Sequence, residues 1–439
     1  MLLGCDTMVA LPSSTKYGQT LFAKNSDRPT EECQPLVQRP NTSHASGTVV
    51  RCQFIDLPQV PTTYAHVGSR PYWCWGYEHG FNEHQVVIGN EGLSSKWPEA
   101  DEPKLIGMEI LRLGLERGRT AAEAVDVMTG LVGEYGQGRF ANAASVRTYD
   151  NGYIVADPSE AYIIDTAGHE WAVKRVERSE GISNEHSVKK DWLSTSSSVE
   201  RSAMAQGWWV PDEGRLDFTR TFCDFQAGEG GLGAARRARS TSLLDVHDGR
   251  IDVRTMIALL RDHSDCMDPG EDFVGTFPNG RSLCMHHGDQ VKGNTAASLI
   301  ADLCGDGSRV PVYWCSMYSP CLGPFLPIFA SGEVPSQLAL GGEDPDLDSP
   351  WWLFRELERW VRTDGVLDED KAVGVRTEWT DFQEKLLIST YEVATEAKGL
   401  QHDGQPEQAE ELLSGHSRAV SATAIMTARR MVGQDSSTR

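Results

Sequence analysis

The sequence predicts an α+β protein in which antiparallel sheets stack on one another and are covered by helices. Strand-like segments follow one another in groups, and short turn sequences separate them, as in hairpins and meanders. Helical segments arrive in blocks, whereas a doubly wound parallel fold would alternate strands and helices along the chain. With 439 residues, the chain is long enough for one large domain or two with an ample core.

The first predicted element is a β-hairpin formed by residues 6–11 and 20–24. Segment 6–11 is short and partly apolar, and a polar stretch separates it from the second strand. Cys5 would then begin a strand instead of lying in a loose tail. The second strand would bring residues 25–28 beside the origin of the first.

Later elements follow the strand and helix periodicities. Strands are predicted at residues 85–89, in a meander over 153–156, 161–165 and 171–176, and at 295–303 and 312–316. Helices are predicted at residues 105–116, 120–135 and 253–262. The second of these opens with Thr120 and with Glu123 three residues later, the pattern of a capping box.

The composition changes at about Gly341. The acidic stretch 343–348 predicts an exposed linker, and Ser349 with Pro350 begins a helix that carries an aromatic stripe. The aromatic stripe suits either a docking surface or a face packed on the rest of the protein, and the amphipathic pattern favours packing. Two further helices are predicted, at residues 378–398 before Gly399 and at residues 406–431.

The charge balance excludes some classes of partner. The chain has 41 basic and 63 acidic residues and a net charge of −22, which argues against binding to nucleic acids and to anionic membrane surfaces. No stretch approaches the roughly 18 apolar residues of a membrane span. The ten cysteines contain no CxxC pair, so we expect mostly buried, reduced thiols in an intracellular, cytoplasmic protein.

The sequence predicts neither a metal site nor a cofactor. His286 and His287 are adjacent, so their side chains would point apart on a strand, although Cys284 is nearby. His263 and Cys266 lack partners at zinc-binding spacing. The glycine-rich stretch 228–233 lacks a following Lys-Ser or Lys-Thr, which is typical of a loop and not of a phosphate-binding cradle.

Cys5 is the candidate nucleophile, because only four residues precede it. If they were removed, the thiol and a free α-amino group would belong to one residue. An α-amino group titrates at roughly 7.7–8.0 and a thiol near 8.5, so the amine can accept the proton of its own sulfur. The alternative is a cysteine without function in a frayed terminus.

Three polar residues are candidates for the supporting roles that amide cleavage requires, namely oxyanion stabilisation and orientation of the amine. Asn90, directly after the predicted strand 85–89, is placed to donate its side-chain amide, or else is a turn residue. Asn184 has the same two interpretations. Asp27 is a candidate acceptor for the new α-ammonium group, or else a turn or cap residue beside Arg28.

Several motifs together resemble those of the secernin family. They are Lys24-Asn25-Ser26-Asp27-Arg28-Pro29, Ser69-Arg70-Pro71-Tyr72-Trp73-Cys74-Trp75-Gly76, Gly80-Phe81-Asn82-Glu83-His84, Arg112-Leu113-Gly114-Leu115-Glu116-Arg117-Gly118, Ala205-Gln206-Gly207-Trp208-Trp209, and Thr255-Met256 ahead of Leu260-Arg261-Asp262. Secernins belong with the dipeptidase-A-type cysteine peptidases, which resemble the penicillin V acylase and bile salt hydrolase group. The resemblance implies a four-layer αββα sandwich of the N-terminal-nucleophile hydrolase type. It divides the chain into a propeptide (1–4), a hydrolase domain (5–340) and a helical region packed on that domain (341–439).

The resemblance also implies roles for individual residues. Cys5 matches the nucleophile that removal of a short propeptide exposes, and Asp27 matches the carboxylate that contacts the terminal amine. Some animal secernins lack this carboxylate, so its presence here favours activity. Lys24 lies where the acylase relatives have an arginine, and a lysine cannot reproduce the planar fork of a guanidinium group.

Two asparagines and one arginine complete the implied site. Asn90 and Asn184 match side chains that surround the oxyanion and the nucleophile in the relatives. For the arginine, spacing favours Arg236 over Arg237 and Arg239, although all three are candidates.

These observations favour a cysteine amidohydrolase, most simply a dipeptidase, that forms a thioester with a small peptide or N-acyl amide. The alternative is a non-enzymatic adaptor, because animal secernins are associated with regulated secretion and the tryptophan-rich C-terminal helices offer a binding surface. Neither interpretation involves nucleic acid or membrane insertion, and both leave homo-oligomerisation open.

Overall fold

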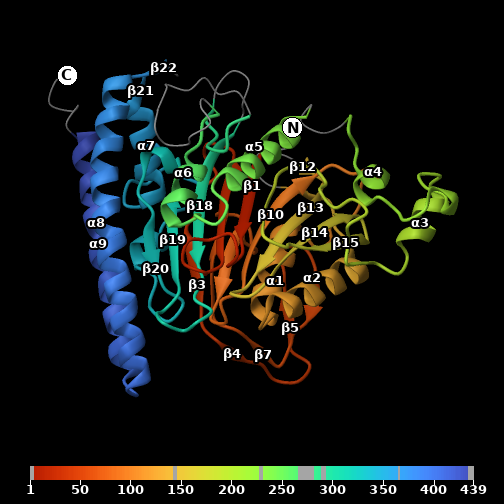
Figure 1. The fold of residues 1–439 in the computed structure, drawn as a ribbon, viewed down its shortest axis with the longest axis horizontal. Coiled ribbons are helices and arrows are strands. Elements are labelled where there is room, and N and C mark those ends of the chain that lie inside the picture. The colour runs from red at the N-terminus through yellow and green to blue at the C-terminus, as the bar shows by residue number, and fades with distance from the viewer. Residues whose placement is uncertain are drawn as a thin grey trace.

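The computed structural model describes residues 4–141, 146–226, 231–264, 281–287, 293–363 and 366–433 (Figure 1). Within these ranges, two antiparallel sheets form the centre of the molecule. The six-stranded sheet has the order β16 (Ser179–Ile182), β1 (Cys5–Ala10), β2 (Leu21–Arg28), β18 (Asn294–Asp302), β19 (Val312–Met317) and β20 (Leu326–Ile328). The eight-stranded sheet has the order β17 (Ser194–Thr195), β15 (Glu170–Arg175), β14 (Ala161–Ala167), β13 (Asp150–Ala156), β10 (Val87–Leu93), β9 (His79–Asn82), β8 (His66–Ser69) and β3 (Leu36–Arg39).

The two sheets pack face to face, and helices cover both outer faces. Strands β1 and β16 contact β10 and β13 across the interface between the sheets. Helices α1 (Gly107–Arg117) and α2 (Ala121–Tyr135) lie on the eight-stranded sheet, and α5 (Leu232–Val246) and α6 (Val253–Leu260) lie on the six-stranded sheet. The predicted four-layer αββα sandwich is therefore confirmed. Its inner strands are buried on both faces, which explains why β1, β2 and β18 contain no exposed residue.

Smaller elements connect these layers. Two-stranded ribbons pair β4 (Thr42–Ser43) with β7 (Thr62–Thr63), β5 (Val49–Arg51) with β6 (Asp56–Pro58), β11 (Phe140–Ala141) with β12 (Val146–Arg147), and β21 (Arg362–Thr363) with β22 (Val366–Leu367). Short helices are α3 (Val199–Ala205), α4 (Phe218–Phe222), η1 (Pro211–Glu213), η2 (Pro320–Leu322) and η3 (Ser336–Ala339). Among these elements, η2 precedes β20 and carries Cys321.

The C-terminal helices lie along the β20 side of the six-stranded sheet. Helices α8 (Glu369–His402) and α9 (Pro406–Gly433) run side by side as a long antiparallel pair, and α7 (Pro350–Val361) packs between them and the sheet (Figure 1). The aromatic stripe of α7 faces inward: Trp351 and Trp352 are buried, and Trp351 Nε1 donates to the carbonyl oxygen of Ala296, 2.7 Å away. The prediction that this face packs on the protein is confirmed, and the acidic linker 343–348 is exposed as expected.

Most predicted elements are present, two of them need correction, and one long helix was missed. The strand expected at residues 85–89 begins later and continues to Leu93, so Asn90 lies inside a strand and not after it. Helix α8 starts at Glu369 and passes through Gly399, because its packing against α9 outweighs the roughly 1 kcal/mol that an interior glycine costs. Helix α5 was not predicted, since its arginine-rich sequence lacks a clear apolar stripe.

Two other expectations concern the glycine-rich stretch and the absence of a membrane span. The glycine-rich stretch 228–233 lies partly outside the described residues, and its described end caps α5 through Gly231. Among the described helices, none combines the length and the apolar character that crossing a bilayer requires.

Candidate active site

Cys5 begins β1 at the end of the sheet where β2 also finishes. The register pairs Cys5 with Ser26, so the predicted hairpin does bring residues 25–28 beside the candidate nucleophile. The Cys5 side chain is buried, and its Sγ lies 4.0 Å from the carbonyl oxygen of Asp27. Burial raises the pKa of the Cys5 thiol to about 12, although the positive charge of Lys24 opposes this shift. While residue 4 remains attached, the sulfur is therefore a neutral thiol near pH 7.

Asn184 and Arg236 surround the backbone nitrogen of Cys5. The Cys5 N–H donates to Asn184 Oδ1 at 2.7 Å, and the Asn184 Nδ2 donates to the carbonyl oxygen of Gly92 at 2.9 Å. A terminal nitrogen of Arg236 also donates to Asn184 Oδ1, at 2.7 Å. The asparagine thus holds both the nitrogen that would become the α-amine and the guanidinium group next to it.

Of the three candidate arginines, the structure places Arg236 beside Cys5. Its guanidinium group is fully buried, pairs with Asp6 at 3.1 Å, and reaches Gly4 so closely that a Cβ there would lie 2.6 Å from it. Arg237 instead approaches Glu180, and Arg239 pairs with Asp262, which follows α6 in the same helix layer. Helical spacing explains the difference, because neighbouring residues on α5 point in different directions.

Asp27 lies at the end of β2, one residue beyond the partner of Cys5. Its Oδ1 accepts a hydrogen bond from Thr295 Oγ1 at 2.6 Å, and its Oδ2 is buried without a hydrogen-bond partner among the described residues. Burial and then the charge of Asp6 raise the pKa of the Asp27 carboxyl group to about 8, against the opposing effects of Thr295 and Arg236. A buried carboxylate oxygen in this condition would gain from a cation placed next to it.

Lys24 lies on the face of β2 that contacts the other sheet. Its Nζ donates to the carbonyl oxygen of Asn90 at 2.5 Å and lies 3.6 Å from the Glu91 carboxylate. Glu91 also accepts a hydrogen bond from Thr7, and burial raises the pKa of Glu91 to about 7. Burial alone would lower the pKa of Lys24, but electrostatic interactions with Cys5 and Glu91 raise it.

Asn90 does not contact Cys5 through any hydrogen bond between described residues. One end of its amide lies 3.0 Å from Asn151 Oδ1, and the other end lies 2.9 Å from the Glu78 carbonyl oxygen and 3.2 Å from the Glu78 carboxylate. The side chain follows the alternation of β10, in which Asn90 is paired with Tyr153 and the neighbouring Glu91 faces Lys24. Both ends of the Asn90 amide are thus engaged by Asn151 and Glu78, and the expected role of Asn90 as an oxyanion donor stays a prediction.

The buried polar groups around Cys5 carry an excess of carboxylates. Ion pairs and short-range charge effects link three cations to five acidic side chains in the described part of the chain. The cations are Lys24, Arg28 and Arg236, and the acidic residues are Asp6, Asp27, Glu32, Glu78 and Glu91. Burial is the main cause of the raised pKa of Asp27 and of Glu91, and the charge of Asp6 adds to it in both cases. Such surroundings would favour a new positive charge at the Cys5 nitrogen.

The raised pKa of Asp27 predicts a pH-dependent stability of the uncleaved protein. Between about pH 4 and pH 8 the unfolded chain releases the Asp27 proton while the folded chain retains it, so this residue lowers stability as the pH rises. In a Cys5→Ala background, in which we expect residues 1–4 to stay attached, adding Asp27→Asn should make the protein progressively more stable relative to its parent over that interval. Urea unfolding at several pH values measures the difference, and two parallel pH profiles would contradict it.

Asp6, Glu91 and Thr295 are among the residues of the site that sequence reasoning missed. Asp6 and Glu91 each adjoin a residue that was identified, but strand alternation sends adjacent side chains to opposite faces, and the strand boundaries were not known closely enough to use this. Thr295 lies 268 residues from Asp27, and only the pairing of β18 with β2 joins them.

The geometry can be set beside known proteins. No family model matches the chain. Solved structures similar to it include a mutant of the conjugated bile acid hydrolase from Clostridium perfringens, with 15% identity, a TM-score of 0.43, and coverage of 77% of this chain and 94% of that one.

Two more distant structures follow. Penicillin V acylase from Agrobacterium tumefaciens is 14% identical, has a TM-score of 0.39, and is matched over 71% of this chain and 83% of its own. The N-acylethanolamine-hydrolyzing acid amidase ortholog of Caenorhabditis elegans is 14% identical and has a TM-score of 0.34. It is matched over 69% of this chain and 94% of its own. Likenesses at these scores are too weak to assign a function to this chain. Its function is therefore inferred from its own residues.

Proposed function

We propose that this protein is a cysteine amidohydrolase whose nucleophile, Cys5, becomes N-terminal when residues 1–4 are removed. One observation carries the proposal: the Cys5 nitrogen is held by Asn184 within a buried, acid-rich cluster in which Asp27 Oδ2 has no hydrogen-bond partner among the described residues. A structural cysteine in a strand needs no such surroundings. A terminal ammonium group would give the Asp27 carboxyl group a charged partner and would favour its ionised form.

Cleavage before Cys5 changes the chemistry of the sulfur. In the uncleaved chain the thiol pKa is raised to about 12, so almost no thiolate exists at neutral pH. Cleavage places an α-amine on the same residue, and an amine that titrates near pH 8 can take the thiol proton. The chain is thus inert before processing and carries its own base afterwards.

The reaction then follows the chemistry of acyl transfer. The α-amine takes the proton of the thiol, and the sulfur attacks the carbonyl carbon of the amide. Hydrogen-bond donors stabilise the tetrahedral anion, each contributing about 3–4 kcal/mol in comparable sites. The protonated amine delivers its proton to the leaving amine, and water hydrolyses the thioester. Asn90, expected to be one of the donors, can act so only if its amide turns away from Glu78 and Asn151.

The substrate class is the finer part of the proposal. Dipeptides or other short N-acyl amides are favoured by the motifs that resemble secernins, and the acidic net charge sets no requirement beyond a small ligand. The alternative adaptor function would use the tryptophan-rich surface of α7. The burial of Trp351 and Trp352 against the sheet supports the hydrolase over this alternative, because these two side chains already pack on the protein.

The intact mass of the purified protein provides the first test. We expect a chain that begins at Cys5, whose thiol reacts with iodoacetamide and which hydrolyses members of a panel of dipeptides and N-acyl amides. A chain that retains Met1, with an unreactive Cys5 and no turnover on the panel, would overturn the proposal. Processed protein that hydrolyses N-acyl amides but no dipeptide would keep the amidohydrolase and reject the dipeptidase.

A further inference from the structure

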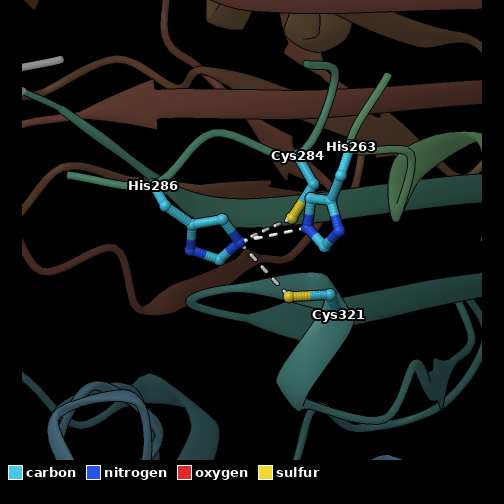
Figure 2. Close-up of side chains that lie close together, drawn as sticks. All are labelled: His263, Cys284, His286 and Cys321. Carbon is cyan, nitrogen blue, oxygen red and sulfur yellow. Dashed lines mark hydrogen bonds between the residues drawn. The ribbon is translucent and has the colours of Figure 1, made fainter. Parts of the chain in front are cut away.

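Two cysteines and two histidines meet in a second buried cluster, outside the candidate active site. His263 follows α6, Cys284 and His286 lie in the segment before β18, and Cys321 belongs to η2. All four side chains are buried, and one potential ligand atom from each lies within 4.8 Å of the others. Figure 2 shows the two rings and the two sulfur atoms directed toward one common point.

The distances from His286 Nε2 to the other three ligand atoms match the edges of a small tetrahedron. His286 Nε2 lies 3.2 Å from His263 Nε2, 3.5 Å from Cys284 Sγ and 3.4 Å from Cys321 Sγ. Zinc binds nitrogen at about 2.0–2.1 Å and thiolate sulfur at about 2.3 Å, so a tetrahedral site has N···N edges of about 3.3 Å and N···S edges of about 3.6 Å. The three observed distances agree with these edges to within about 0.2 Å.

Hydrogen bonding alone does not account for this arrangement. The Nε2 atom of an imidazole ring takes part in one in-plane hydrogen bond, as donor or as acceptor according to the tautomer. Here three groups converge on the single Nε2 atom of His286, and two of them are poor hydrogen-bonding sulfur atoms. A cation at the common centre would use all four groups at once.

We propose that His263, Cys284, His286 and Cys321 bind one zinc ion in a closed, tetrahedral site. Two nitrogen and two sulfur donors in this geometry are typical of structural zinc. A supporting contact is also present: His286 Nδ1 lies 2.9 Å from Glu358 Oε1, so that carboxylate accepts the Nδ1–H and leaves Nε2 as the ligand atom. Glu358 is in turn held by Ser319 and by Arg362, whose Nε lies 3.2 Å away.

The sequence predicted no metal site, because no Cys and His residues close together in the chain have zinc-binding spacing. His286 is part of the cluster and the adjacent His287 is not. The sequence also showed no partners at zinc-binding spacing for His263 and Cys266, and Cys266 lies outside the described residues. The ligands actually come from three separate segments of the chain. The Cys-x-His spacing of Cys284 and His286 was the one local signal of the site.

The position of the cluster gives the metal a structural role next to the active site. Met285 lies between two ligands; its side chain reaches Gly4, and its backbone N–H donates to Thr295 Oγ1, which donates to Asp27. The metal would therefore fix the segment that bears on the residue before the nucleophile. Through Glu358 it would also connect α7 to the body of the protein.

Metal analysis of the wild-type protein tests the proposal without any assay of activity. Protein purified without chelators should contain about one zinc per chain. Protein produced in cobalt-supplemented minimal medium should show the visible d–d bands of tetrahedral cobalt and thiolate-to-cobalt charge transfer. Substoichiometric metal after zinc supplementation, or a Cys284–Cys321 disulfide that lowers the mass by about 2 Da and blocks alkylation, would overturn it.

Single substitutions locate the ligands. Cys284→Ala and Cys321→Ala should lose the metal, whereas Cys315→Ala, which changes a buried cysteine of β19 outside the cluster, should retain it. Glu358→Gln should keep the metal but weaken its affinity by roughly 10–100-fold in competition with a chromogenic chelator. If the ligand variants fail to fold, the cobalt spectrum of the wild type and the Glu358→Gln affinity still decide the matter. Full zinc content in both cysteine variants would contradict the site.

Discussion

Replacing Cys5 by alanine should abolish amide hydrolysis and leave residues 1–4 attached to the chain. Removal of an enzyme's nucleophile typically costs on the order of 10⁶ in kcat, and no other described group near the candidate site offers a thiol in the same surroundings. Cys5→Ser should behave almost as severely, because a hydroxyl group is a much weaker acid than a thiol and the α-amine cannot activate it as well. Intact mass spectrometry and the substrate panel measure the two losses separately.

The Cys5 variants should remain folded. The side chain is small and lies at the end of a strand whose partners are unchanged, so the circular dichroism spectrum and Tm should stay close to those of the wild type. Cys315→Ala serves as the matched control, since it removes a buried thiol from the same sheet and should keep full activity. Turnover at the wild-type level in Cys5→Ala would end the nucleophile assignment, whatever the state of the N-terminus.

The second large effect is expected from Asn184. In Asn184→Ala, the Cys5 nitrogen and the Arg236 guanidinium group lose the oxygen that accepts from both of them. We expect kcat to fall by about 10²-fold or more with a much smaller change in KM, because a misplaced amine impairs the proton transfer more than substrate binding. Asn184→Asp, which retains an acceptor oxygen at this position, should recover part of the loss.

Asn90→Ala is the informative comparison for Asn184. Since the Asn90 amide is engaged by Asn151 and Glu78, its removal should lower the free energy of unfolding by about 1–3 kcal/mol, with a smaller effect on kcat than Asn184→Ala. The sequence expectation was that Asn90 donates to the oxyanion. A drop in kcat for Asn90→Ala that equals or exceeds that of Asn184→Ala, at unchanged stability, would restore that role and contradict the present geometry.

The local pattern of the sequence determined most secondary-structure elements and the part of the candidate site that the N-terminal hairpin forms. The hairpin at the N-terminus was predictable because two short apolar stretches flank a polar link, and its register follows once the strands pair. This alone brings Asp27 and Lys24 near Cys5. The meander, the capped helix at Thr120 and the inward aromatic face of α7 were equally local, since each depends on periodicity or on a cap within a few residues.

Only the tertiary structure decided which distant residues join Cys5, Lys24 and Asp27. Sequence spacing left three arginines open, and the direction of each on α5, a helix that was not predicted, selects Arg236. The same is true of the two asparagines, because Asn184 accepts from the Cys5 nitrogen whereas the Asn90 amide contacts Asn151 and Glu78. The four residues of the cysteine and histidine cluster lie up to 58 positions apart between His263 and Cys321, a separation that no local periodicity records. Long-range pairing of strands and the packing of helices on sheets bring such residues together, and these depend on the whole chain at once.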